Sequence, residues 1–187
     1  KKKLSIVSND VSEHKAYAGK HFSPHNLVSL SPKTYPQKQF VESYKRDIPI
    51  IAQVGSAGTG KTIMAMYCAL AEVLDNTSYF DKVVIIRSAV QSREIGFLSG
   101  TQEQKEEVYT LPYVSICDEI VNFKSNNFEN LKNKGFIEFA TTSFLRGLTF
   151  DNSVIIADEA QNMNYEELTT LTTRMGKDSR LVLCGDT

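Results

Sequence analysis

Short apolar runs alternate along the chain with segments whose apolar residues fall at helical spacing. The runs predict strands at residues 48–54, 82–87, 136–140, 153–157 and 180–184. They are nearly continuous and lack the every-second-residue alternation of a sheet with one face in water. The pattern therefore predicts a parallel sheet that helices cover.

Helical segments lie between these strands. Residues 37–44 predict a short helix, and residues 62–74 predict a longer one with good helix formers and neither Gly nor Pro. Asn164 and Glu167 form a capping pair at the start of a further helix, which ends near Gly176. Strands that alternate with helices indicate an α/β fold with a doubly wound, mostly parallel sheet and helices on both faces.

The middle of the chain predicts less regular structure. Thr101 and Gln104 have the spacing of a capping box and predict a charged helix. We expect Pro112 to break this helix, with a second helical segment after it. Residues 124–134 are rich in Asn and Lys and predict a solvated loop with one helical turn.

The ends of the chain suggest its organisation. Residues 1–33 are polar and irregular and predict an N-terminal arm. Residues 34–187 suit one α/β domain with a core large enough to fold alone. The first residue is Lys rather than Met, and Thr187 follows a strand that leads into a predicted loop. We therefore expect a fragment that is truncated at its C-terminus.

A phosphate-binding motif lies between the first predicted strand and the helix after it. The P-loop pattern G-x-x-x-x-G-K-[ST] is spelled by Gly55, Ser56, Ala57, Gly58, Thr59, Gly60, Lys61 and Thr62. The backbone N–H groups of such a loop point at the phosphates, and the helix dipole adds positive potential. Lys61 can reach the β- and γ-phosphate oxygens, and the Thr62 hydroxyl can bind Mg²⁺. The motif predicts a nucleoside triphosphate site.

Three polar residues complete this predicted site. Asp158 ends a strand, so its carboxylate can hold Mg²⁺ through a water molecule. Glu159 can orient a water molecule against the γ-phosphate, which indicates hydrolysis rather than transfer. A salt-bridged, non-catalytic Glu159 is the alternative. Gln161 is a candidate sensor of the γ-phosphate, or a cap of the turn that follows.

An arginine often stabilises the charge that develops in this chemistry, and it can come from another subunit. The arginines around the predicted site are Arg87, Arg93, Arg146, Arg174 and Arg180. A structural role remains the alternative for each of them.

Charge and composition narrow the class of protein only slightly. The formal net charge of −1 gives no general signal for nucleic acid, so any such contact would use a local basic patch. Cys68, Cys117 and Cys184 stand singly, which favours reduced core thiols in a cytoplasmic protein. His21 and His25 lack further ligands, so we expect solvated histidines. No apolar run reaches the ~18 residues of a transmembrane helix.

The order of the motifs resembles the PhoH family of phosphate-starvation-type ATPases, which have a superfamily 1 helicase-like core. The matching segments are residues 33–37, 55–62, 87–90, 96–100, 144–149, 158–162 and 185–186. This resemblance implies ATP as the nucleotide and an adenine-reading role for Gln37. It also implies that Arg146 and Arg174 lie near the phosphates and act in catalysis. It further implies RNA or single-stranded nucleic acid as a partner and a homo-oligomeric ring.

The chain departs from the family pattern at several positions. Ser56 and Ser88 each stand where the family commonly has proline, and neither change removes a donor to phosphate. Leu148 stands where the family has a second arginine, which weakens the case that this loop clamps phosphate or nucleic acid. The chain also stops before the Gln that follows the Gly-Asp pair in the family.

Three functions remain open from the sequence. The first is an ATPase that uses Mg²⁺ and couples hydrolysis to remodelling of RNA or single-stranded nucleic acid. The second is an ATP-dependent switch or assembly module with little turnover. The third is a small-molecule kinase, for which residues 124–134 would make a poor lid. Replacement of Glu159 by Gln distinguishes the first from the second.

Overall fold

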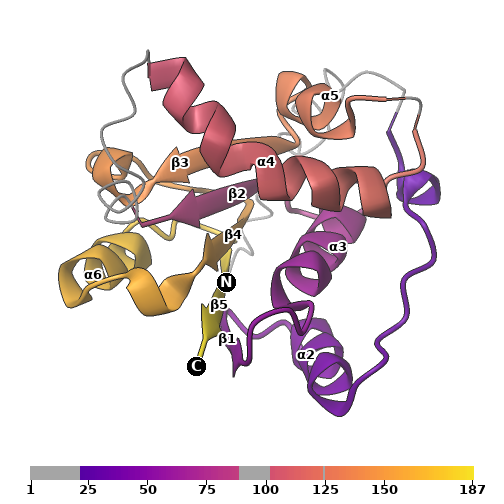
Figure 1. The fold of residues 1–187 in the computed structure, drawn as a ribbon, viewed down its shortest axis with the longest axis horizontal. Helices are drawn as coiled ribbons and strands as arrows, with labels where there is room; N and C mark the ends of the chain where they lie inside the picture. Colours follow the sequence, from indigo (N-terminus) through magenta and orange to yellow (C-terminus); the bar gives the residue numbers. More distant parts are fainter. Residues whose placement is uncertain (1–21, 89–101, 124) are drawn as a thin grey trace, which may run out of the picture.

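The computed structural model describes residues 22–88, 102–123 and 125–187 (Figure 1). Arg93, His21 and Thr101, for which the sequence made predictions, lie outside the described residues.

One parallel sheet organises the described part of the chain. Its five strands are β1 (Ile50–Gly55), β2 (Lys82–Arg87), β3 (Ile137–Thr141), β4 (Ser153–Asp158) and β5 (Arg180–Asp186). They lie in the order β1-β5-β4-β2-β3, and every neighbouring pair is parallel. The predicted α/β fold is therefore confirmed, and each strand forms within two residues of its predicted bounds.

The register of the sheet brings the carboxyl ends of the strands to one edge. Gly55 lies opposite Asp186, and Arg87 lies opposite both Asp158 and Thr141. The loops that carry the predicted motifs therefore begin at the same edge, as expected for ligand sites in parallel sheets.

Helices cover both faces of this sheet. They are α2 (Tyr35–Lys45), α3 (Lys61–Val73), α4 (Gln102–Ile120), α5 (Asn127–Asn133) and α6 (Tyr165–Thr173), with the short 3₁₀ helices η1 (Pro24–Asn26), η3 (Thr142–Phe144) and η4 (Ala160–Asn162). Figure 1 shows α2 and α3 on one side of the sheet and α6 on the other.

Alternate residues of β2, β4 and β5 contribute to two separate hydrophobic cores. Val83 and Ile85 belong to the larger core, which α2, α3, α4 and α5 cover. Val84 and Ile86 belong to the smaller core, which Leu171 of α6 closes. Both faces of β2, β4 and β5 are buried, which explains the continuous apolar runs of these strands. The edge strand β1 differs, since Ile50 is 47% and Val54 is 70% exposed.

Two predictions about the middle of the chain are wrong. Pro112 lies inside α4, and the helix continues to Ile120. The proline is exposed, whereas Tyr113 and Cys117 of the same helix are buried. Burial of that face offsets the hydrogen bond lost at the proline. The segment predicted as a solvated loop with one helical turn instead forms the seven-residue helix α5, which the fully buried Phe128 anchors.

The last residues of the predicted arm contact the domain. Phe22 and Leu27 pack against the larger core, and the N–H of Val28 donates to the carbonyl oxygen of Ile120 at 2.9 Å. The boundary at residue 33 stays a prediction, but Leu27 and Val28 lie against the end of α4.

Candidate functional site

The predicted P-loop lies between β1 and α3 at the carboxyl edge of the sheet. Gly58 and Gly60 have φ angles of 72° and 81°, a left-handed conformation that side chains disfavour. A Cβ atom on Gly60 would also lie 3.1 Å from Nε2 of Gln37. Residues 56–59 are exposed, so the loop and the positive end of the 13-residue helix α3 face solvent.

Lys61 is the cation of this loop. Its Nζ donates to the carbonyl oxygens of Gly55 and Ser56 at 2.9 and 2.8 Å. The same ammonium forms an ion pair with Oδ1 of Asp186 at 2.6 Å, and 30% of the Asp186 side chain is exposed. The ammonium therefore sits at the mouth of the loop, where phosphate oxygens could replace these oxygens as its partners.

Asp158 joins the P-loop to the end of β4. The Thr62 hydroxyl donates to its Oδ1 at 2.7 Å, although 96 residues separate the two. The Tyr113 hydroxyl of α4 donates to its Oδ2 at 2.8 Å. Thr62 and Asp158 are thus together, as the predicted Mg²⁺ site requires, and oxygen ligands of this kind suit Mg²⁺.

Tyr113 is a residue that the sequence analysis missed. It is completely buried, and burial raises the pKa of its hydroxyl well above the ordinary value, with the nearby Asp158 charge adding to the shift. The hydroxyl therefore stays protonated and donates. Tyr113 precedes Cys117 by one helical turn and Ile120 by two, so the helical period places it on the buried face of α4. The expectation that Pro112 ends the helix concealed that signal.

Glu159 and Gln161 form a second set of contacts at this edge. Glu159 has a φ of 53°, which is uncommon for a residue with a side chain. Its carboxylate accepts a hydrogen bond from Nε2 of Gln161 at 2.6 Å. Oε1 of Gln161 in turn accepts from the N–H of Asp186 at 2.8 Å. Gln161 therefore links Glu159 to the residue that pairs with Lys61.

Arg87 is the arginine that the fold brings to Glu159. Its Nη2 lies 3.9 Å from Oε1 of Glu159, and only 14% of its side chain is exposed. Arg87 ends β2 directly beside Asp158 in the register of the sheet. This position makes Arg87 a better candidate for a role at the site than the other described arginines.

Gln37 contacts the P-loop directly. Its Oε1 accepts hydrogen bonds from the N–H groups of Lys33 and Thr34, and its Nε2 donates to the carbonyl oxygen of Thr59 at 3.0 Å. The amide thus ties the start of α2 to the loop. The adenine-reading role of Gln37 stays a prediction.

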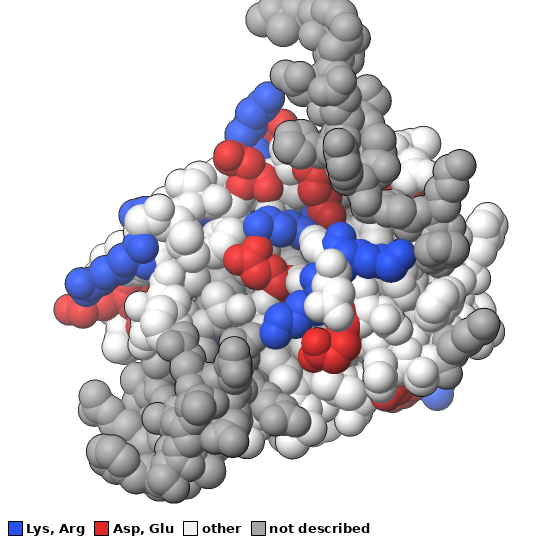
Figure 2. All heavy atoms as spheres, turned by 90° about the horizontal axis from the view of Figure 1, so that it is seen from above, with Lys and Arg blue, Asp and Glu red and all other residues white. Residues whose placement is uncertain are grey.

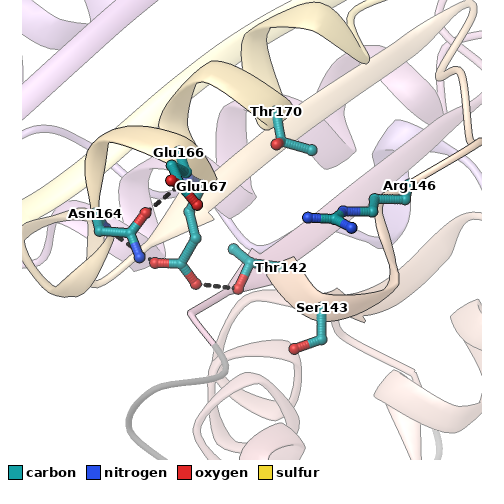
Figure 3. Close-up of a pocket in the computed structure, with 7 residues that line it drawn as sticks. All are labelled: Thr142, Ser143, Arg146, Asn164, Glu166, Glu167 and Thr170. Carbon is teal, nitrogen blue, oxygen red and sulfur yellow. Dashed lines mark hydrogen bonds between the residues drawn. The ribbon is translucent and has the colours of Figure 1, made fainter.

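Arg146 lies in a different place from the P-loop. It points into a pocket of about 340 Å³ between η3 and α6 (Figure 3). The pocket is lined by Thr142, Ser143, Arg146, Asn164, Glu166, Glu167 and Thr170. Arg146 comes from the segment after β3, whereas the P-loop follows β1, and these strands lie at opposite ends of the strand order, roughly 19 Å apart across the sheet. The fold therefore does not bring Arg146 to Lys61 within one chain.

Arg174 lies at the amino edge of the sheet. It caps the C-terminus of α6, and its Nη1 donates to the carbonyl oxygen of Leu148 at 3.3 Å. Its own carbonyl oxygen accepts from the N–H of Phe150, just before β4 begins. Because α6 runs back along the sheet, the predicted catalytic residue Arg174 lies at the edge opposite to the P-loop.

Charge on the surface is mixed. Figure 2 shows one face of the molecule, on which the described Lys and Arg side chains lie interspersed with Asp and Glu. Such a face suits local contacts to an anion better than long-range attraction of a polyanion.

The sheet order, the loop after β1 and the acidic residue at the end of β4 define a P-loop NTPase-like protein of the α/β class. The sequence profile of the family described as "PhoH-like protein" matches residues 29–187. The chain belongs to the PhoH-like family.

Curated relatives agree with this assignment. A PhoH-like protein of Bacillus subtilis is 33% identical over 159 residues, which cover 84% of this chain and 48% of the relative. Protein PhoH2 of the same organism is 32% identical over 88% of this chain and 38% of its own length. A PhoH-like protein of Synechocystis is 33% identical over 82% of this chain and 46% of its own length. The chain thus spans less than half the length of these three relatives.

The described residues contain no helix that is both long and apolar enough to cross a membrane.

Proposed function

We propose that this chain binds ATP together with Mg²⁺ and hydrolyses it. The hydrogen bond of 2.7 Å between Thr62 and Asp158 carries the proposal, because it unites the two elements that hold metal and phosphate in P-loop proteins. Thr62 and Asp158 would hold the ion, which supplies positive charge to the phosphate oxygens when bound. The exposed backbone of residues 56–59 and the Lys61 ammonium would bind the phosphates.

Glu159 is the proposed base. Its carboxylate would orient a water molecule toward the γ-phosphate and accept a proton as the water attacks. Gln161 and Arg87 contact its two carboxylate oxygens and would fix the orientation of the group. This arrangement favours water as the acceptor and therefore hydrolysis over phosphoryl transfer to a bound substrate.

We propose further that hydrolysis is coupled to RNA or single-stranded nucleic acid in a homo-oligomer. Exposed aromatic side chains support a single-stranded partner, since bases stack on such rings. Phe144 is 58% exposed and Tyr165 is 84% exposed, and both lie in the elements that border the Arg146 pocket. Arg146 is remote from Lys61 in its own chain, so it would reach a phosphate site only from a neighbouring subunit.

A second candidate function is an ATP-dependent switch with little turnover. The position of Arg146 and Arg174 favours it, because a P-loop enzyme that lacks an arginine on the developing charge can lose ~10³–10⁵ in turnover. Among the described arginines, Arg87 is the candidate for stabilising the developing charge, because it contacts Glu159.

Phosphate release from ATP tests the proposal. We would measure it with and without Mg²⁺ and single-stranded RNA, for this chain and for a version extended beyond Thr187. Lys61→Ala serves as the blank. Glu159→Gln should reduce turnover by roughly 10²–10⁴-fold and leave ATP binding intact. Binding without turnover in both lengths of chain would contradict hydrolysis and leave the switch.

A further inference from the structure

The buried hydroxyl of Tyr113 contacts the carboxylate that the proposed function assigns to Mg²⁺. Oδ2 of Asp158 accepts from Tyr113 at 2.8 Å, while Oδ1 accepts from Thr62 at 2.7 Å. Tyr113 is 0% exposed and Asp158 is 6% exposed. Each carboxylate oxygen therefore has one donor, and little of Asp158 is exposed to solvent.

Packing in the core explains the aromatic ring of Tyr113 but not its hydroxyl. The ring lies in the larger core, with its centroid 5.9 Å from that of Phe139. A phenylalanine would fill almost the same space without a polar atom. A buried hydroxyl without a partner would be costly, so tyrosine is favourable here because Asp158 accepts its hydrogen bond.

We infer that Tyr113 is a positioning residue for the Mg²⁺-binding carboxylate of Asp158. This inference rests on the proposed function. A carboxylate can rotate about its terminal torsion, which has broad preferences. The donor on Oδ2 fixes that rotation and keeps Oδ1 directed toward Thr62. Lone pairs on Oδ1 then remain for a water molecule of the metal.

The same contact makes α4 part of the metal site. Tyr113 lies on α4, whereas the P-loop and Asp158 belong to β1, α3 and β4. Partners that orient metal ligands typically change metal affinity by 10–100-fold when they are removed. The position of α4 therefore contributes to how tightly the nucleotide site holds its ion.

Tyr113→Phe tests the inference, with Tyr109→Phe as the matched control. Tyr109 is a buried tyrosine one helical turn earlier on α4. We would measure ATP affinity by calorimetry across a series of Mg²⁺ concentrations and in chelator. Mg²⁺ should strengthen ATP binding by the wild type, and Tyr113→Phe should raise the Mg²⁺ concentration at which half of this increase is reached by ~10-fold or more. Its ATP affinity in chelator should match the wild type, which would also show that the variant is folded.

The outcomes separate the inference from the proposed function. A wild type whose ATP affinity does not respond to Mg²⁺ would overturn both. If the wild type responds to Mg²⁺ and Tyr113→Phe reaches its half-maximal response within two-fold of the wild-type Mg²⁺ concentration, the inference alone is overturned. An equal shift in Tyr109→Phe would also overturn it, because the effect would then belong to the helix and not to the hydroxyl on Asp158.

Discussion

The two ends of β5 carry ion pairs of different kinds. At its amino end, Arg180 contacts Glu72 at 3.0 Å and Asp47 at 2.5 Å, and its guanidinium lies 4.3 Å from the ring centroid of Tyr44. At its carboxyl end, Asp186 contacts Lys61 at 2.6 Å. Glu72 and Lys61 lie near opposite ends of α3. One strand and one helix are thus joined by charge at both of their ends.

The surroundings of the two pairs differ. Only 3% of the Arg180 side chain is exposed, and two carboxylates and two aromatic rings surround its planar group. Lys61 is a flexible ammonium, and its partner Asp186 is 30% exposed at the mouth of the P-loop. The Arg180 cluster therefore fixes the position of α3, whereas Lys61 presents the cation that we propose for phosphate.

Breaking the amino-terminal cluster should have the largest effect on stability. Arg180→Ala removes the cation from Glu72 and Asp47, each of which keeps one hydrogen bond from a tyrosine hydroxyl, and it removes the stacking on Tyr44. Loss of a fully buried ion pair costs about 3–5 kcal/mol, and partial exposure of both carboxylates reduces the expected cost to about 2–3 kcal/mol. Urea unfolding measures this change in the free energy of unfolding.

Lys177→Ala is the control for this variant. Lys177 lies three residues before Arg180, and its side chain is 85% exposed. The control should change the free energy of unfolding by less than about 0.5 kcal/mol. Equal stability of Arg180→Ala and Lys177→Ala would contradict a fixed cluster at the amino end.

Acid should weaken the same cluster by a smaller amount. The hydrogen bond from Tyr79, followed by the Arg180 guanidinium, lowers the pKa of Asp47 below its ordinary value. A carboxyl with a lowered folded-state pKa contributes stability above its unfolded pKa of about 3.9, and this is lost as pH falls through the folded value. We expect urea unfolding below about pH 4 to show a weaker pH dependence in Asp47→Asn than in the wild type.

Asp178→Asn should keep the wild-type dependence, because Asp178 contacts the exposed Lys177. If the stability of Asp47→Asn falls with pH as steeply as that of the wild type, Asp47 is not a source of this acid sensitivity.

Local patterns predicted the parts of the site that lie close together in sequence. The strand at residues 82–87 was predicted with its observed bounds, since both of its faces are buried and its apolar run is continuous. The P-loop followed from its glycines and its position between strand and helix. The meeting of Thr62 with Asp158 was predictable in outline, because Asp158 ends β4 and Thr62 follows the loop at the carboxyl end of β1, on the same edge of the sheet.

Contacts between distant segments were not predictable in this way. The hydrogen bond from Tyr113 to Asp158 spans 45 residues and depends on how α4 crosses the sheet. Whether Pro112 breaks α4 depends on burial of the opposite helix face, which local propensity does not contain. Arg174 is close to the site motifs in sequence, but the direction of α6 carries it to the other edge of the sheet.

Calorimetric titration of ATP in chelator tests most directly whether the Lys61 ammonium binds phosphate. It compares the wild type with Lys61→Ala and Asp186→Asn. Lys61→Ala should weaken ATP by roughly 10–100-fold, because a hydrogen bond to a charged group is lost. Asp186→Asn should tighten ATP several-fold, since the carboxylate that competes for the ammonium is gone. Equal affinity of Lys61→Ala and the wild type would contradict a phosphate site at this edge of the sheet.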